Sequence, residues 1–327
     1  MYDVITIGSN TMDLFVHTDR SEIIDIRSKS GSEEFISYPA GTKMLITKLM
    51  HNFGGNGANS AVTFSRLGFR TAYIGEIGKD QNGNTILKHL KKEKIDFLGA
   101  RGEQSGLSII LDSIEEDRTI LVYKGCNNDL RYSKIKLPRL RTKWLYLSSM
   151  LGESLLSMQR VAEHARKKKA KIAFNPSSTM LENETQKAID MIRYAEVLVL
   201  NREEAETLVG KNIPEVNIQK LLVFGPKVVA ITDGKNGAVG YKDGFFYRVG
   251  ARQDLKIVET TGAGDAFAST FTAGIILNKP FDFCLKMAIN NAESVISHHG
   301  AQNTLLSRKK LFEAVNKDKR VIEKRKA

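Results

Sequence analysis

The 327-residue sequence has little of what stabilises secreted, disulfide-rich or membrane-spanning proteins. It contains only two cysteines, Cys126 and Cys284. Two cysteines are too few for a disulfide framework or for a tetrahedral zinc site of their own. No run of 18 apolar residues occurs, and the first residues lack the basic segment and apolar core of a secretory signal. We therefore expect a protein of the reducing cytoplasm with no membrane partner.

The formal net charge is +12, from 49 basic and 37 acidic residues. Such an excess is compatible with a nucleic acid, a membrane surface or an anionic substrate as partner. Residues 308–327 hold nine Lys or Arg and three Asp or Glu, so this stretch alone supplies +6. We interpret it as a basic C-terminal tail, solvated and helical or frayed. Since no nucleic-acid recognition motif accompanies the charge, we expect no specific nucleic-acid partner.

Most of the sequence alternates strand and helix patterns. Strands are expected at residues 3–7, 71–75, 144–147, 171–174, 197–200 and 228–231, with a hairpin at 238–249. Helices are expected from about residue 58 to a cap at Gly68, and at 82–92, 154–168, 185–194, 203–208, 264–277 and 282–297. This alternation predicts a mostly parallel sheet covered on both faces by helices, in a single α/β domain over residues 1–327.

Two stretches depart from that alternation. Residues 20–50 mix charged residues with short apolar pieces, so we expect loops and short exposed strands there. Residues 106–123 alternate as strands do, on either side of the acidic turn Glu115-Glu116-Asp117.

The most informative segment is Glu259-Thr260-Thr261-Gly262-Ala263-Gly264-Asp265-Ala266-Phe267. Gly262 and Gly264 permit a sharp turn and a close approach to a ligand, and a helical pattern follows at once. The N–H groups and the dipole of a helix start suit a phosphate. Asp265, in the first helical turn, could take a proton from an attacking hydroxyl. The alternative is an ordinary helix start with an acidic first turn.

Other phosphate motifs do not fit. Gly75-Glu76-Ile77-Gly78-Lys79-Asp80 has the wrong spacing for a Walker loop, and Asp80 stands where a hydroxyl is needed. The Gly-x-Gly pairs at Gly262 and Gly55 are followed by Phe267 and Ser60 where a dinucleotide fingerprint requires glycine. A nicotinamide enzyme is thereby disfavoured.

Two signatures about 200 residues apart carry a family resemblance. Residues 54–61, Gly-Gly-Asn-Gly-Ala-Asn-Ser-Ala, and residues 260–267, Thr-Thr-Gly-Ala-Gly-Asp-Ala-Phe, resemble the N- and C-terminal signatures of the ribokinase-like sugar kinases of the PfkB family. Weaker similarity lies at residues 9–13, 201–204, 232–237 and 300–302. The resemblance implies a ribokinase-like three-layer α/β sandwich with a mostly parallel central sheet. It also implies a small β-sheet lid from residues 14–50 and 103–131, and family members often form homodimers through such lids.

The resemblance further implies a role for particular residues. Asp265 would be the general base, and the N–H groups of Gly262, Ala263 and Gly264 would form an anion hole. Sugar hydroxyls would be held by Asp13, Gly54, Gly55 and Asn59. The nucleotide would be bound by Asn201, Glu204, Thr232, Gly234 and Gly237, with Glu204 organising Mg²⁺ through water. Glu259 and Thr261 would belong to a monovalent cation site for K⁺.

The resulting expectation is an ATP-dependent kinase that phosphorylates a hydroxyl of a small sugar or sugar derivative. Two departures from the family pattern bear on details: Glu259 replaces an aspartate near the cation site, and Asn56 replaces the lysine of many ribokinases. A nucleoside acceptor is the nearest alternative, and it would need an aromatic slot from Phe15, Phe35, Tyr38 or Tyr123. A non-catalytic binding relative is disfavoured because Asp265 is intact. Asn201 and Glu204 could equally be a helix cap and its first-turn acid.

Overall fold

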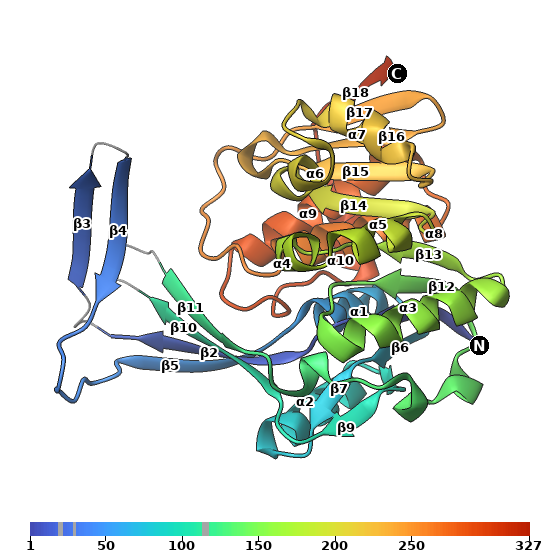
Figure 1. Ribbon diagram of the computed structural model, residues 1–327. Helices are drawn as coiled ribbons and strands as arrows, with labels where there is room; N and C mark the ends of the chain where they lie inside the picture. The colour runs from blue at the N-terminus through green and yellow to red at the C-terminus, as the bar shows by residue number, and fades with distance from the viewer. Residues whose placement is uncertain (19–21, 29–30, 113–117) are drawn as a thin grey trace.

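A large sheet runs through the body of the protein, in a computed structural model that describes residues 1–18, 22–28, 31–112 and 118–327 (Figure 1). The strand order is β18-β17-β16-β15-β14-β13-β12-β1-β6-β8. Every neighbouring pair from β8 to β15 is parallel, whereas β16, β17 and β18 extend the sheet by antiparallel pairing. The strands are β1 (Tyr2–Ile7), β6 (Thr71–Ile74), β8 (Asp96–Phe97), β12 (Thr142–Leu147), β13 (Lys171–Phe174), β14 (Val197–Asn201), β15 (Val228–Thr232), β16 (Ala238–Lys242), β17 (Phe245–Val249) and β18 (Glu323–Lys326).

Helices cover both faces of this sheet, because alternate strand residues point to opposite sides. In β1, Val4 belongs to the core under α1, α8, α9 and α10, whereas Ile5 belongs to the core under α3, α4, α5 and α7. The helices are α1 (Asn56–Arg66), α2 (Gln81–Lys92), α3 (Gly152–Lys167), α4 (Ser178–Asn183), α5 (Thr185–Ile192), α6 (Arg202–Val209), α7 (Pro214–Leu222), α8 (Ala263–Ile276), α9 (Phe281–Ile296) and α10 (Arg308–Lys317). The three-layer α/β architecture expected from the sequence is confirmed. Among the described residues, no helix has both the length and the apolar character needed to cross a membrane.

A second, smaller sheet projects from the body as an arm (Figure 1). Its strands are β2 (Thr11–His17), β5 (Lys48–Gly54), β10 (Gly106–Asp112) and β11 (Arg118–Tyr123), in the order β11-β10-β2-β5. The hairpin of β3 (Glu22–Ser28) and β4 (Gly31–Ser37) stands at the far end. β2 to β5 thus span Thr11 to Gly54, slightly beyond the expected lid segment 14–50, whereas β10 and β11 lie within the expected segment 103–131. The acidic turn expected at 115–117 lies outside the described residues.

The basic stretch after residue 307 forms part of the body. Leu311 and Val315 of α10 are buried against α9 and its neighbours. β18 pairs with β17 at the edge of the central sheet, where Lys324 lies 4.1 Å from the centre of the Phe245 ring. The expected helix is confirmed over Arg308–Lys317, but the stretch packs on the body and ends in an edge strand instead of forming a solvated tail.

Candidate active site

The expected catalytic segments meet at the carboxyl ends of β14 and β15. In open parallel sheets, ligands bind in the crevice at this edge. A cavity of about 140 Å³ lies there and contains Asp265. Its lining includes five predicted residues, namely Asn201, Glu204, Thr232, Gly264 and Asp265. It also includes residues without a predicted role, namely Asn56, Asn175, Pro176, Ser177, Val199 and Leu200. The structure therefore brings together segments that are far apart in the sequence.

Asp265 lies in the first turn of α8, where its carboxylate Oδ2 accepts a hydrogen bond of 2.8 Å from Nδ2 of Asn59 in α1. The side chain keeps partial access to the cavity, but the surrounding protein desolvates its carboxyl group. This burial raises the pKa of Asp265 to about 6, against the opposing effect of the Asn59 hydrogen bond. A carboxylate with such a pKa is suited to accept a proton near neutral pH.

The turn before α8 depends on glycine. Gly262, the residue before α8 begins, has φ of 82°, and a Cβ there would overlap Cβ of Ala301. Gly264 is different, because a Cβ there would point into open space. The N–H of Ala263 donates to the carbonyl of Thr260 at 3.2 Å, so one of the three expected anion-hole donors is engaged within the turn.

Asn201 and Glu204 form a capping box at the start of α6. Oδ1 of Asn201 accepts from the Glu204 N–H at 2.7 Å, and Oε2 of Glu204 accepts from the Asn201 N–H at 2.8 Å. The helix-cap interpretation is thus correct for both residues, which nevertheless also line the cavity. Burial raises the pKa of Glu204 to about 7, and the negative charge of Asp265 acts in the same direction.

The residues expected to hold the sugar cluster where β2 and β5 meet α1. Asp13 is 4% exposed, and its Oδ1 accepts from the hydroxyl of Thr11 at 2.8 Å. The backbone of Gly54 runs so close that a Cβ would overlap Oδ2 of Asp13, and a Cβ on Gly55 would overlap the backbone of Asn10. Small residues at 54 and 55 therefore permit the strand and helix to meet around Asp13, while Asn59 reaches Asp265.

The expected nucleotide residues divide between two places. Thr232 ends β15 and lines the cavity that contains Asp265, whereas Gly234 and Gly237 lie in the turn that follows. Gly237 has φ of 91°, and a Cβ there would overlap the carbonyl of Val249. Neighbouring residues of the same turn line a separate cavity of about 490 Å³, together with Arg202, Gln253 and Arg325. The structure therefore places Gly234 and Gly237 in the turn after β15, outside the lining of the cavity that contains Asp265.

Glu259 is buried beside residues 300–302, which follow α9. Its Oε2 accepts from the N–H of Gly300 at 3.3 Å. Thr261 lies two residues further on, at the turn before α8. The monovalent cation site proposed for these two residues stays a prediction.

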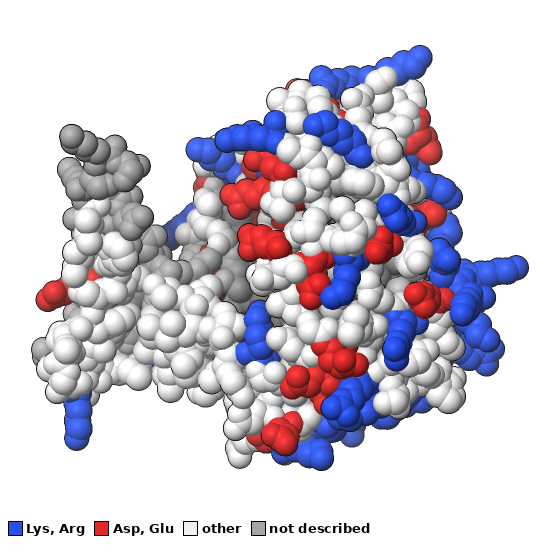
Figure 2. Space-filling model, in the orientation of Figure 1, with Lys and Arg blue, Asp and Glu red and all other residues white. Residues whose placement is uncertain are grey.

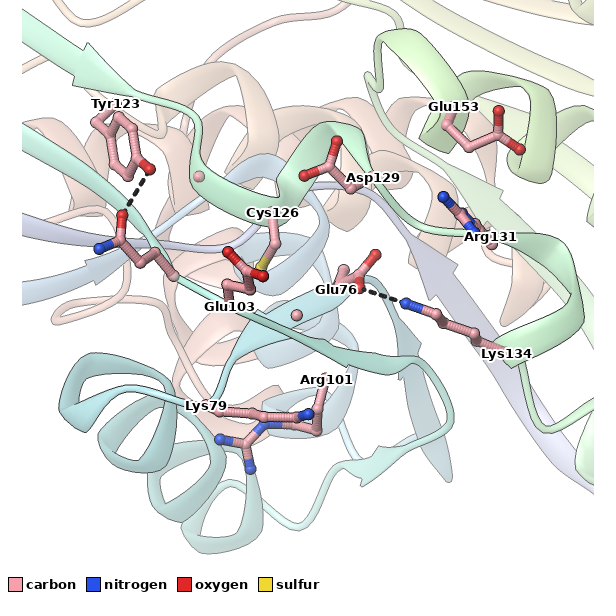
Figure 3. Close-up of a pocket in the computed structure, with 13 residues that line it drawn as sticks. Glu76, Lys79, Arg101, Glu103, Tyr123, Cys126, Asp129, Arg131, Lys134 and Glu153 are labelled. Atoms are coloured by element: carbon pink, nitrogen blue, oxygen red, sulfur yellow. Dashed lines mark hydrogen bonds and ion pairs between the residues drawn. The ribbon is translucent and has the colours of Figure 1, made fainter.

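A larger cavity of about 670 Å³ lies elsewhere, between β7 (Glu76–Gly78), β9 (Ala100–Gly102) and the start of α3 (Figure 3). It carries charges of both signs, including Lys134, which contacts Glu76 at 3.4 Å. Of the aromatic residues considered for a nucleoside base, Tyr123 lines it, but none of the residues expected to serve in catalysis, sugar, nucleotide or metal binding does. The larger of these two cavities is therefore not the one that contains Asp265.

The sequence matches the pfkB family carbohydrate kinases over residues 22–308. This chain belongs to that family. It is 29% identical to the ribokinase of Bacillus subtilis (strain 168), with 97% of this chain and 100% of that protein covered. A putative ribokinase II from E. coli in complex with ATP and Mg²⁺ has a TM-score of 0.81 at 17% identity, covering 97% of this chain and 100% of that one. The adenosine kinase of Sinorhizobium meliloti has a TM-score of 0.79 at 22% identity, covering 95% and 98%.

This pfkB-family protein is thus a carbohydrate kinase, that is, a phosphotransferase. The two structural matches show the shared fold. Sequence reasoning gave no role to Asn175 and Ser177, although both follow β13 in the polar stretch Asn175-Pro176-Ser177-Ser178. Polar residues that follow a central parallel strand are a usable signal, because strand ends face the ligand crevice.

Proposed function

We propose that this pfkB-family kinase transfers the γ-phosphate of Mg-ATP to a hydroxyl of a small sugar, with Asp265 as the general base. The observation that carries the proposal is the shared cavity: Asp265 faces the same space as Asn201, Glu204 and Thr232. A proton acceptor with a pKa of about 6 is thereby placed beside a helix start that suits phosphate.

In the proposed reaction, the sugar hydroxyl oxygen forms a bond to the γ-phosphorus, while the bond from that phosphorus to the bridging oxygen breaks. The electron pair of the broken bond leaves with ADP, and the hydroxyl proton passes to Asp265. The N–H groups of Gly262 and Gly264, at the start of α8, would stabilise the charge on the transferring phosphoryl group.

The donor set fits a magnesium ion that is shared with the nucleotide phosphates. Glu204 and Asn201 offer oxygen ligands, which Mg²⁺ prefers, and a nearby cation would favour the ionised form of Glu204. Both Glu204 oxygens already accept hydrogen bonds, from Asn201 and from Ser178, so contact through water is the natural mode. Within the described residues, no group of three or more His, Cys, Asp or Glu could hold a metal. Bound Mg²⁺ would neutralise developing phosphate charge.

The two substrates would occupy opposite ends of the site. The sugar would lie against Asp13, Gly54, Gly55 and Asn59, whose polar side chains and bare backbone suit a ligand rich in hydroxyl groups. The nucleotide would extend from Thr232 toward the turn with Gly234 and Gly237. Because Thr232 directly precedes that turn, one extended ligand could contact both cavities along this edge.

An ADP-release assay over pentoses, hexoses, ketohexoses, sugar acids, sugar phosphates and nucleosides tests the proposal. We expect turnover with a sugar or sugar derivative, because the polar residues of the acceptor end match hydroxyl groups. The assay is run with and without K⁺, which also tests Glu259 and Thr261. Turnover with nucleosides alone would identify a nucleoside kinase of the same fold. No turnover on any compound under either condition would contradict the kinase proposal.

We also propose that two copies associate through the projecting arm. Apolar side chains on its edge strands are exposed, among them Leu49 (50%), Leu121 (52%) and Val122 (50%). Figure 2 shows that Lys and Arg spread over the body, whereas the described part of the arm on this face is nearly uncharged. An uncharged, apolar sheet edge is a typical interaction surface.

Light scattering after size-exclusion chromatography tests this association. We expect about twice the chain mass of 36.4 kDa for the wild type. Leu121→Arg, which places a charge on the arm, is expected to give the monomer mass, whereas Leu156→Arg, at an exposed leucine of α3 on the body, is the matched control. A wild-type monomer at micromolar concentration would contradict the proposal.

A further inference from the structure

Asp265 stands at one end of a series of side-chain hydrogen bonds that crosses four parts of the fold. Asn59 of α1 donates to Asp265 at 2.8 Å, and Gln302 donates through Nε2 to Oδ1 of Asn59 at 2.8 Å. Oε1 of Gln302 lies 2.7 Å from Nε2 of His89, near the end of α2. We call these four side chains the Asp265 network. Its members lie up to 243 positions apart in the sequence.

The direction of each hydrogen bond follows from the carboxylate at the end. Ionised Asp265 can only accept, so Asn59 must present its NH₂ group to it. The amide oxygen of Asn59 then faces Gln302, which must likewise present its NH₂ group. The Gln302 oxygen in turn requires a donor, and His89 supplies the N–H of Nε2. Two amides that could otherwise adopt either orientation are thereby restricted to one.

The far end of the network is held rigidly. Gln302 is 3% exposed, and its backbone carbonyl accepts from the guanidinium of Arg66 at 2.7 Å. The His89 ring is stacked on the ring of Phe53 in β5, with 3.8 Å between centroids and 6° between planes. Burial lowers the pKa of His89, but Nε2 carries a proton whether it donates as the neutral tautomer or as the cation. His89 and Gln302 therefore act as a fixed donor and acceptor pair.

We propose that Gln302 and His89 are positioning residues, which orient the Asn59 amide so that its N–H, rather than its oxygen, faces Asp265. The inference rests on the proposed role of Asp265 as the base. Without Gln302, the Asn59 oxygen loses its donor, and only the carboxylate still selects the orientation of the amide. The amide then turns its oxygen toward Asp265 more often, and that oxygen repels the ionised form. The positioning residues thus keep the Asn59 N–H directed at Asp265, which stabilises the ionised carboxylate. They would do so without contacting either substrate.

Other charged groups near the network do not replace this effect. Tyr146 and Glu204 interact with Asp265, and Glu204 disfavours a second negative charge nearby. Arg66, Lys92 and Glu93 surround His89 at the other end. Since burial already raises the pKa of Asp265, loss of the Asn59 donor must raise it further. The active, deprotonated form would then require a higher pH.

Gln302→Met, which removes the amide but keeps the length of the side chain, tests the proposal through the pH profile. We expect the acidic limb of kcat/KM to move up by about one pH unit, so that activity falls about fivefold at pH 6 and about tenfold at pH 5 and below. At pH 8, where Asp265 is ionised in both proteins, activity should differ much less. A loss of the same size at every pH would show a merely structural role and overturn the proposal. Asn303→Met removes a neighbouring amide that is hydrogen-bonded outside the network, and it should leave the limb unchanged.

Titration of ¹³C-labelled aspartate by NMR measures the same pKa without relying on activity. The Asp265 signal is assigned by its loss in Asp265→Asn, and its pKa is compared in wild type, Gln302→Met and His89→Phe. His89→Phe keeps a ring against Phe53 but removes the donor, so a smaller upward shift is expected. An unchanged pKa in both variants overturns the positioning role. An upward shift accompanied by full activity of Asp265→Asn would preserve that role and refute Asp265 as the base.

Discussion

Asp265→Asn is expected to lower kcat by about 10³-fold while nucleotide binding persists, because the amide cannot take the proton of the attacking hydroxyl. The substitution keeps the size of the side chain at the start of α8. Asn201, Glu204 and Thr232, which are proposed to bind the nucleotide, remain in place. Steady-state ADP release measures kcat, and calorimetry with a non-hydrolysable ATP analogue measures nucleotide affinity.

Asp282→Asn is the matched control, because Asp282 occupies the first turn of the next helix, α9, but is exposed away from the cavity. It should retain wild-type turnover. In the wild type, kcat/KM should rise as the pH increases through about 6, where Asp265 loses its proton. Substantial turnover by Asp265→Asn would exclude this residue as the general base.

Gly262→Ala is expected to lower the free energy of unfolding by about 3 kcal/mol and to abolish activity. A left-handed backbone conformation costs alanine about 1–2 kcal/mol, and overpacking adds roughly 1–3 kcal/mol. Both costs apply, since φ is 82° and the new Cβ would overlap Ala301. Denaturant unfolding followed by circular dichroism measures the stability.

Gly264→Ala separates steric strain from function in the same turn. Its Cβ would meet no other atom within 4 Å, so stability should change little. Gly264 lines the same cavity as Asp265, however, and a methyl group there would occupy space proposed for the phosphoryl group. We therefore expect normal stability with reduced kcat/KM. Equal destabilisation of the two variants would contradict the assigned packing of Gly262.

The central sheet could be predicted because each buried strand is a short apolar run between helical patterns. Val197–Leu200 and Val228–Ile231, for example, lie within β14 and β15. Gly68 follows α1 with φ of 82°, as expected of a glycine that ends a helix. These features depend on local sequence, so local patterns sufficed.

The edge strand β18 could not be predicted from its own residues. Glu323-Lys324-Arg325-Lys326 has no apolar alternation, and charged side chains usually indicate solvent. The strand is held by backbone pairing with β17 and by cations over the rings of Phe245 and Phe246. The partner strand lies about 80 residues earlier, so only the folded chain reveals the interaction.

In the candidate site too, some residues could be predicted from local sequence, whereas the contacts between distant segments could not. Asp265 and its glycines could be identified from one contiguous motif, and the cavity brings Asp265 and Gly264 together with Asn201, Glu204 and Thr232. The contacts of Asn59 with Asp265 and Gln302 could not be found, because no local rule links residues more than 200 positions apart. These two contacts form only when α1, α8 and residues 300–302 pack together in the folded chain.

The position of β1 in the middle of the sheet has a consequence for biosynthesis. Ile7 pairs with both Ile74 and Leu147, so β1 emerges from the ribosome well before its second partner. At a synthesis rate on the order of 10 residues per second, this apolar strand waits more than about ten seconds for β12. A nascent chain of this kinase therefore carries one unpaired edge of an apolar strand until β12 has been synthesised.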